Sequence, residues 1–76
     1  MNKNKRQSLR SAVEYLGKAS DIVDDVLQDE EYCLDNMPEN LQNSERFENM
    51  ESAIDHMREA SDMISSAVEE LEEAQS

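Results

Sequence analysis

The sequence contains very little glycine, proline, cysteine or aromatic residue. Its 76 residues include one of each of the first three and no tryptophan, and only 4% are aromatic. A single cysteine, Cys33, excludes an intrachain disulfide and a cysteine-based zinc site. It favours a reducing compartment, and the alternative is a disulfide between two chains. A single glycine, Gly17, excludes a glycine-rich phosphate loop, so we do not expect nucleotide binding. The only proline, Pro38, lies in a polar stretch that is typical of a turn.

Long hydrophobic runs are also missing. No stretch approaches the roughly 20 apolar residues of a membrane span, and the charged start Met1–Arg6 has no apolar run behind it. We therefore expect a cytoplasmic protein with no membrane partner.

Positive charge is scarce and unevenly placed. Seven Lys and Arg residues stand against 19 Asp and Glu residues, which gives a net charge of -12 at pH 7. This balance disfavours nucleic acid and anionic membranes as partners and favours basic proteins. Four of the bases precede the first acid, and we call them the basic tip: Lys3, Lys5, Arg6 and Arg10. The remainder of the chain is expected to form an acidic body.

An internal repeat sets the expected architecture. The segment Ser11-Ala12-Val13-Glu14 returns in the second half of the chain as Ser52-Ala53-Ile54-Asp55, and Ala19-Ser20-Asp21 returns at the same offset as Ala60-Ser61-Asp62. Two copies of one helix on either side of a proline-containing turn predict an all-α fold, an antiparallel two-helix hairpin that resembles a coiled coil. We predict a single domain over residues 1–76, with helices at about 5–34 and 45–74 and a turn at 35–44.

Each predicted helix carries a seam of residues in alternating steps of four and three, which is the spacing of a coiled coil. Ser20 and Ser61 occupy equivalent seam positions. Their hydroxyls are expected either to form a small polar layer that sets the register or to bond their own helix carbonyls. The seam residues are Leu9, Val13, Leu16, Ser20, Val23, Leu27, Glu30 and Leu34, then Phe47, Met50, Ile54, Met57, Ser61, Ile64, Val68 and Leu71.

Beside each seam lies a row of small residues at intervals of seven, followed by a third row of larger side chains. Together they widen the apolar arc of each helix to roughly 160°, more than one neighbouring helix covers. The arc predicts a homodimer whose two hairpins form a four-helix bundle; the alternative is a lone hairpin. We call this surface the apolar face: Ala12, Tyr15, Ala19, Ile22, Val26, Ala53, His56, Ala60, Met63 and Ala67.

Acids gather on the opposite face. They form either a merely solvated surface or a functional one that binds a basic groove. We call this surface the acidic face: Asp21, Asp24, Asp25, Glu51, Asp55, Glu59, Asp62 and Glu69.

The residues needed for catalysis are sparse. His56 is the only histidine, and the seam pattern offers no place for a nucleophile and an acid beside it. A carboxylate metal site around His56 and Glu59 has too few ligands. We expect a protein that is not an enzyme and that has no catalytic, cofactor-binding or metal-binding residues.

The helix ends carry capping residues. Asn4, with Gln7 three residues later, is predicted to cap the first helix, and Ser44 to cap the second. Pro38 is predicted to end the first helix near residues 34–36 and to open one short helical turn. Met37 and Leu41 are expected to cover that end of the bundle.

The turn with its flanks, YCLDNMPENLQNSER at residues 32–46, resembles a segment of small acidic helical-hairpin proteins of Gram-positive bacteria and their phages or mobile elements. The match covers the turn closely and the second helix loosely. The resemblance implies a bacterial or phage origin and no enzyme activity, and it carries no functional residues to transfer. A turn more constrained than a solvent connection requires indicates either a shared binding role or the needs of chain reversal.

Three functional hypotheses follow. The first is a non-enzymatic adaptor that forms a homodimer and binds another protein, with basic partners favoured by the charge. The second is an acidic nucleic-acid mimic, such as a phage or mobile-element inhibitor that occupies a basic groove of a host protein. The third is a DNA-associated role through the basic tip.

Overall fold

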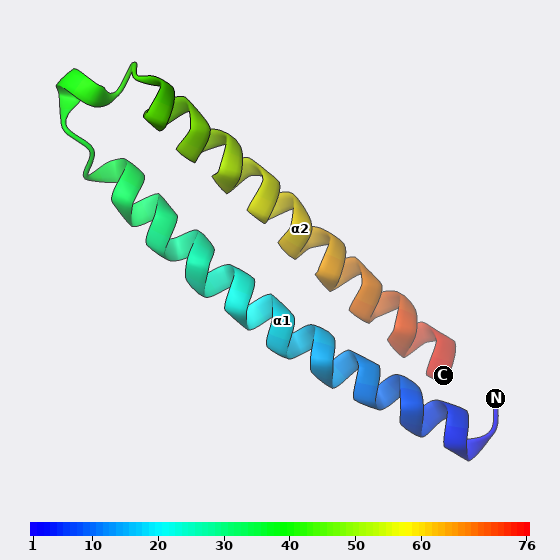
Figure 1. The fold of residues 1–76 in the computed structure, drawn as a ribbon. Helices are drawn as coiled ribbons and strands as arrows, with labels where there is room; N and C mark the ends of the chain where they lie inside the picture. Colours follow the sequence, from blue (N-terminus) through cyan, green and yellow to red (C-terminus); the bar gives the residue numbers. More distant parts are fainter.

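The two halves of the chain contain long stretches free of proline, and both fold as continuous helices (Figure 1). The computed structural model describes all residues from 1 to 76. Helix α1 spans Lys3–Asp35, a short 3-10 turn η1 spans Glu39–Leu41, and helix α2 spans Glu45–Gln75. The two helices lie side by side and antiparallel, which confirms the predicted all-α hairpin.

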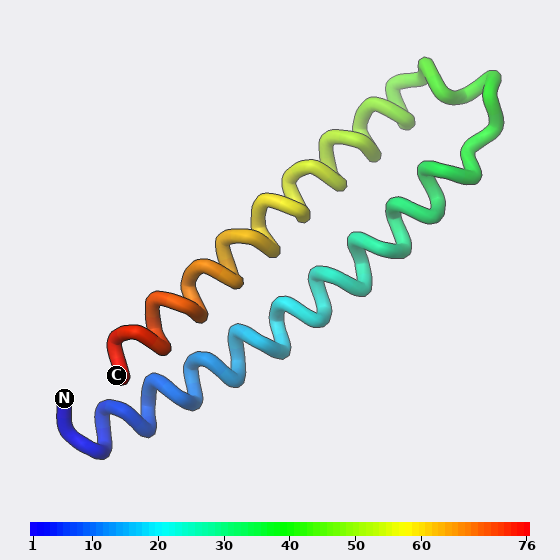
Figure 2. The backbone as a smooth tube through the Cα atoms, turned by 180° about the vertical axis from the view of Figure 1, so that it is seen from behind, coloured from blue at the N-terminus to red at the C-terminus, as the bar shows by residue number.

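The hairpin is a rod, with the turn at one end and both termini at the other (Figure 2). Its extents are 59 × 14 × 14 Å and its radius of gyration is 17.3 Å. A compact chain of this length has a radius of gyration of about 11 Å. The molecule therefore has only one line of contact, between α1 and α2, in which to bury apolar side chains.

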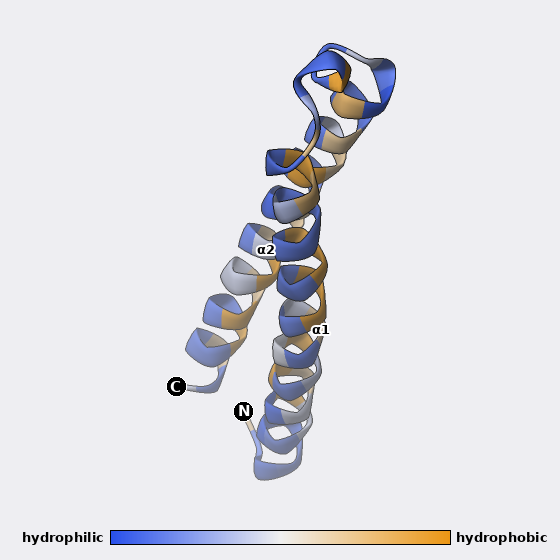
Figure 3. Cartoon of the chain, turned by 90° about the vertical axis from the view of Figure 1, so that its left-hand side faces the viewer, coloured by the Kyte–Doolittle hydropathy of each residue, from blue (hydrophilic) through white to orange (hydrophobic).

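The predicted seam lies along this line of contact. All sixteen seam residues are half-buried or buried, although Ile54, which is 2% exposed, is the only residue of the chain that is fully buried. Apolar residues recur as a broken stripe along each helix in Figure 3. Two helices leave their shared seam open along both edges, and this explains why the other seam residues stay half-buried.

The helix starts agree with one capping prediction and contradict the other. The Ser44 hydroxyl oxygen accepts a hydrogen bond from the Phe47 N–H at 3.2 Å, as predicted. At α1 the cap is Asn2, whose Oδ1 accepts from the Lys5 N–H at 2.8 Å. The prediction of Asn4 was wrong because the extended backbone of Asn2 starts the helix two residues earlier and places Asn4 inside it.

The turn is held by its own hydrogen bonds. Helix α1 ends at Asp35, and the Pro38 carbonyl accepts from the Leu41 N–H at 2.9 Å to form the short helical turn that the sequence predicts. The Ser44 hydroxyl also donates to the Leu41 carbonyl at 2.6 Å. Met37 is half-buried, but Leu41 is 40% exposed, so Leu41 does not cover the end of the rod as expected. These hydrogen bonds show that residues of the turn hold the chain in the shape that reverses its direction.

Gly17 lies in the middle of α1, where a glycine weakens a helix. A Cβ atom built at Gly17 meets no atom within 4 Å. Nothing in the hairpin therefore requires the absence of a side chain at this position.

We predict that Gly17→Ala stabilises the protein. Alanine restricts the unfolded chain, so the free energy of unfolding should rise by about 0.5 to 1 kcal/mol. For a chain of this size the gain raises Tm by about 2 to 8 °C. Thermal unfolding followed by circular dichroism at one fixed protein concentration measures it, with Gly17→Ser as the control that gains less. A lower Tm for Gly17→Ala would show that another molecule packs against this position.

Candidate interaction surfaces

Antiparallel pairing gives the hairpin two different sides, and polar contacts between the helices identify one of them. On this polar side the Ser61 hydroxyl donates a hydrogen bond to the Asp24 carboxylate at 2.8 Å. The Arg58 guanidinium pairs with the Glu31 carboxylate at 3.1 Å. A shallow groove on the same side is lined by residues of both helices, including Gly17.

The apolar face lies on the other side of the hairpin. Asp24 and Glu31 flank the α1 seam on one edge, and the row that contains Ala19 flanks it on the other edge. Arg58 and the row that contains Ala60 flank the α2 seam in the same way. Because the polar rows meet on one side, both small-residue rows share the opposite side and form one continuous surface across the two helices.

Large apolar side chains on this surface are open to solvent in the single hairpin. Tyr15 is 71% exposed, Ile22 is 64% exposed, Val26 is 49% exposed and Met63 is 63% exposed. The alanines of α1, Ala12 and Ala19, are half-buried against the seam. The remaining members of the face on α2 are exposed: Ala53, His56, Ala60 and Ala67. At one edge of this surface the Lys18 ammonium lies 5.8 Å from the centroid of the Tyr15 ring.

The centre of the apolar face is set by the register of the two helices. Asp24 lies level with Ser61, and Glu31 lies level with Arg58. The same register places Ile22 of α1 close to the level of Met63 of α2. The two largest aliphatic side chains of the face therefore lie at about the same level on the two helices, with the small-residue rows between them.

The acidic face is exposed except at one residue. Asp24 is half-buried, because it flanks the seam and accepts the hydrogen bond from Ser61. Neither expectation for the seam serines describes this contact, since Ser61 bonds a carboxylate of the facing helix and not Ser20 or its own backbone. The other seven members are exposed: Asp21, Asp25, Glu51, Asp55, Glu59, Asp62 and Glu69.

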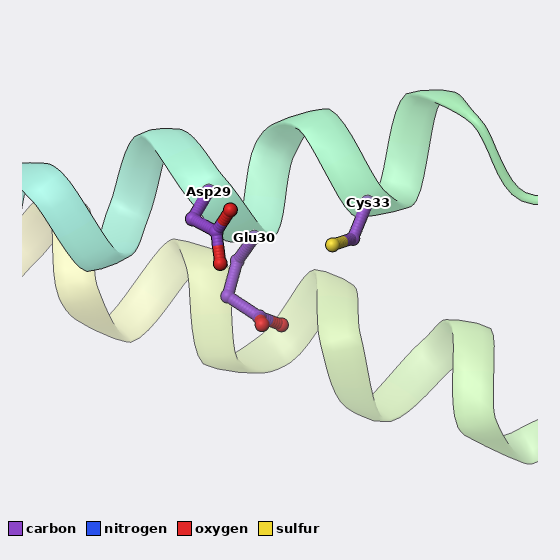
Figure 4. A group of neighbouring side chains, drawn as sticks. All are labelled: Asp29, Glu30 and Cys33. Atoms are coloured by element: carbon purple, nitrogen blue, oxygen red, sulfur yellow. The ribbon is translucent and has the colours of Figure 1, made fainter.

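One small group of ligand-type side chains was not predicted from the sequence. The group lies within five consecutive residues of α1 and consists of Asp29, Glu30 and Cys33 (Figure 4). Their carboxylate and thiol atoms lie within 4.8 Å of one another. The signal was present in the spacing, because residues four apart share a helix face. Asp29 and Cys33 are exposed. Three mixed donors fall short of the four ligands of a structural zinc site, and this arrangement alone assigns no metal.

Comparison of the chain with family models, curated proteins and solved structures finds no match. Neither helix combines the length and hydropathy that crossing a bilayer requires.

We predict that the Asp24–Ser61 contact contributes measurably to stability. Ser61→Ala removes a hydrogen bond to a charged group, and because Asp24 stays partly hydrated the loss in free energy of unfolding should be about 1 kcal/mol. Ser20→Ala is the matched control, since Ser20 occupies the equivalent seam position without this bond, and it should change stability by less than about 0.5 kcal/mol. Urea unfolding measures both variants. If both variants lost the same free energy of unfolding, the Asp24–Ser61 hydrogen bond would contribute nothing to stability.

Proposed function

We propose that this protein is a non-enzymatic, cytoplasmic protein-interaction module that acts as a homodimer through its apolar face. The observation that supports it most directly is the exposure of Tyr15, Ile22, Val26 and Met63 on one side of the hairpin. Contiguous apolar patches of this kind mark interaction sites in monomeric proteins. Two hairpins stacked through these faces give each helix a second neighbour, as in a four-helix bundle.

The exposed area of the chain is large enough to support such a dimer. A compact chain of 8.7 kDa exposes about 4,700 Å² by the usual size scaling, whereas this chain exposes 5905 Å². The excess is about 1,200 Å², and a stable protein interface buries about 800 Å² on each partner. Covering the apolar face would therefore bring the exposed area close to that of an ordinary small protein.

Dimerisation leaves the acidic face as the outer surface. Seven of its eight carboxylates are exposed. Only Asp55 among those seven has a nearby cation, since its carboxylate lies 3.8 Å from the Arg58 guanidinium. A surface of this charge attracts basic proteins over a range set by the salt concentration. The adaptor role thus has one face for the second copy and one for a basic partner.

We predict that a charge midway along the apolar face breaks the dimer. Ile22→Glu would bury a carboxylate without a partner, so the dissociation constant should rise at least 100-fold. Gln28→Glu is the matched control, because it adds the same charge at an exposed α1 position outside the apolar face. Sedimentation equilibrium at micromolar concentration measures the mass of each protein.

The expected result is a dimer for the native protein and for Gln28→Glu, and a monomer for Ile22→Glu. A monomeric native protein would overturn the homodimer and with it the adaptor proposal. A dimer of Ile22→Glu as tight as the native dimer would place the interface elsewhere.

The acidic nucleic-acid mimic is a second candidate. What supports it is the length of the rod, 59 Å, along which exposed carboxylates continue from α1 to α2. Rows of carboxylates on a rigid support can occupy a basic groove that normally binds phosphates.

The salt dependence of binding tests the mimic. For a mimic, binding to a basic nucleic-acid-binding protein should weaken at least tenfold between about 50 and 200 mM salt, as phosphate contacts do. The apolar contacts that hold the proposed homodimer should change little over that range, and sedimentation at each salt concentration is the control. Calorimetric titration at several salt concentrations measures the dependence. A flat salt dependence would rule out mimicry.

A further inference from the structure

We infer that the second copy binds to the apolar face in the opposite direction, so that the basic tip of each chain lies beside the turn end of its partner. In this arrangement α1 packs on the partner's α1, and α2 packs on the partner's α2. The twofold axis passes between the two hairpins at the level of Ile22 and Met63. The inference rests on the proposed homodimer and adds its orientation.

Two symmetric ways of stacking the apolar faces have to be compared. A twofold axis parallel to the helices puts both turns at the same end and packs α1 on the partner's α2. A twofold axis perpendicular to the helices puts the turns at opposite ends. Both keep neighbouring helices antiparallel and both bury Ile22 and Met63, so helix packing alone does not choose between them.

The rows within the face also suit both arrangements. On α1 the order is Ala12, Tyr15, Ala19, Ile22, Val26, Asp29 and Cys33, and on α2 it is Ala53, His56, Ala60, Met63, Ala67, Glu70 and Ala74. The pattern of residues on α2 is nearly symmetric about Met63, and His56 and Glu70 lie at equal distances from it. Turns at opposite ends bring His56 beside the partner's Glu70, and turns at the same end bring it beside the partner's Asp29.

The charges at the two ends of the rod favour opposite ends. The basic tip contains four bases and no acid. The last turns of α2 lie at the same end of the rod and carry four acids, Glu69, Glu70, Glu72 and Glu73, so the charges at this end nearly cancel. The last two turns of α1 contain four acids and no base: Asp29, Glu30, Glu31 and Asp35. The turn and the start of α2 add Glu39, Glu45 and Glu48 against one base, Arg46.

Stacking both turns at the same end would place the acidic turn ends of the two copies against each other. Stacking them at opposite ends instead places each acidic turn end beside the nearly neutral terminal end of the partner, which removes this repulsion. With the axis near Ile22, Arg10 lies level with the partner's Asp35. Like charges across an interface disfavour a wrong arrangement and opposite charges favour the right one.

Cys33 makes the orientation measurable. It is exposed and lies in the small-residue row of the apolar face near the turn. With turns at opposite ends, Cys33 lies level with the partner's Ala12, and the two copies of Cys33 lie about 31 Å apart along the rod, at about 1.5 Å per residue. With turns at the same end, the two copies of Cys33 lie at the same level.

The experiment treats the dimer with a short bis-maleimide cross-linker and maps the linked peptides by mass spectrometry. Ala12→Cys should give covalent dimers joined from residue 12 to the partner's residue 33, with at least a tenfold higher yield than the native protein. Ala12→Cys combined with Cys33→Ser should return to the native yield. Sedimentation of each variant before cross-linking confirms that it is still a dimer.

Links between the two copies of Cys33 in the native protein, or between two copies of residue 12, would overturn the orientation and leave the homodimer intact. A monomer in sedimentation would overturn the homodimer itself.

A distance between spin labels gives a second measurement. Gln7 is exposed near the start of α1, and labels at Gln7→Cys in a Cys33→Ser background report the separation of the two tips. With turns at opposite ends the labels should lie about 45 Å apart or more, because roughly 31 residues at about 1.5 Å each separate them along the rod. With turns at the same end the labels share one level. A separation no larger than the width of two helices, about 20 to 25 Å, would therefore contradict the proposed direction.

Discussion

The single seam between α1 and α2 is the contact on which the rest of the structure depends. It buries one residue fully, Ile54, and leaves the other seam residues half open, because a pair of helices cannot close the edges of its own seam. The two open edges are flanked by different residues. Hydrogen-bonded and charged groups flank one edge, and small apolar residues flank the other. The hairpin is therefore a molecule with two unlike sides.

These sides respond to water in opposite ways. Carboxylates remain hydrated when exposed, so the acidic face is stable without a partner. Exposed Tyr15, Ile22 and Met63 favour association, because covering them with another apolar surface lowers the free energy. At the same time the net charge of -12 opposes random association. This combination supports the proposed dimer over aggregation.

The parts of the structure that depend on local sequence were predictable. Steps of four and three residues identified the seam, and Pro38 and Ser44 identified the turn and the second helix start. Contacts between the helices were not predictable, because the level of Asp24 relative to Ser61 is fixed by the length and path of the turn. The choice of Asn2 over Asn4 as cap also escaped prediction, since both asparagines offer the same side-chain acceptor and only the backbone at residue 2 separates them.

The internal repeat explains why the two sides differ. Both helices carry the same order of rows, with polar residues on one edge of the seam and small apolar residues on the other. In an antiparallel pair, corresponding edges of identical helices meet on the same side, as the contact between Glu31 and Arg58 illustrates. A second helix with the reverse order of rows would have placed alanines opposite carboxylates on both sides. The repetition of one helix pattern, folded back on itself, is therefore sufficient to concentrate the apolar residues on a single face.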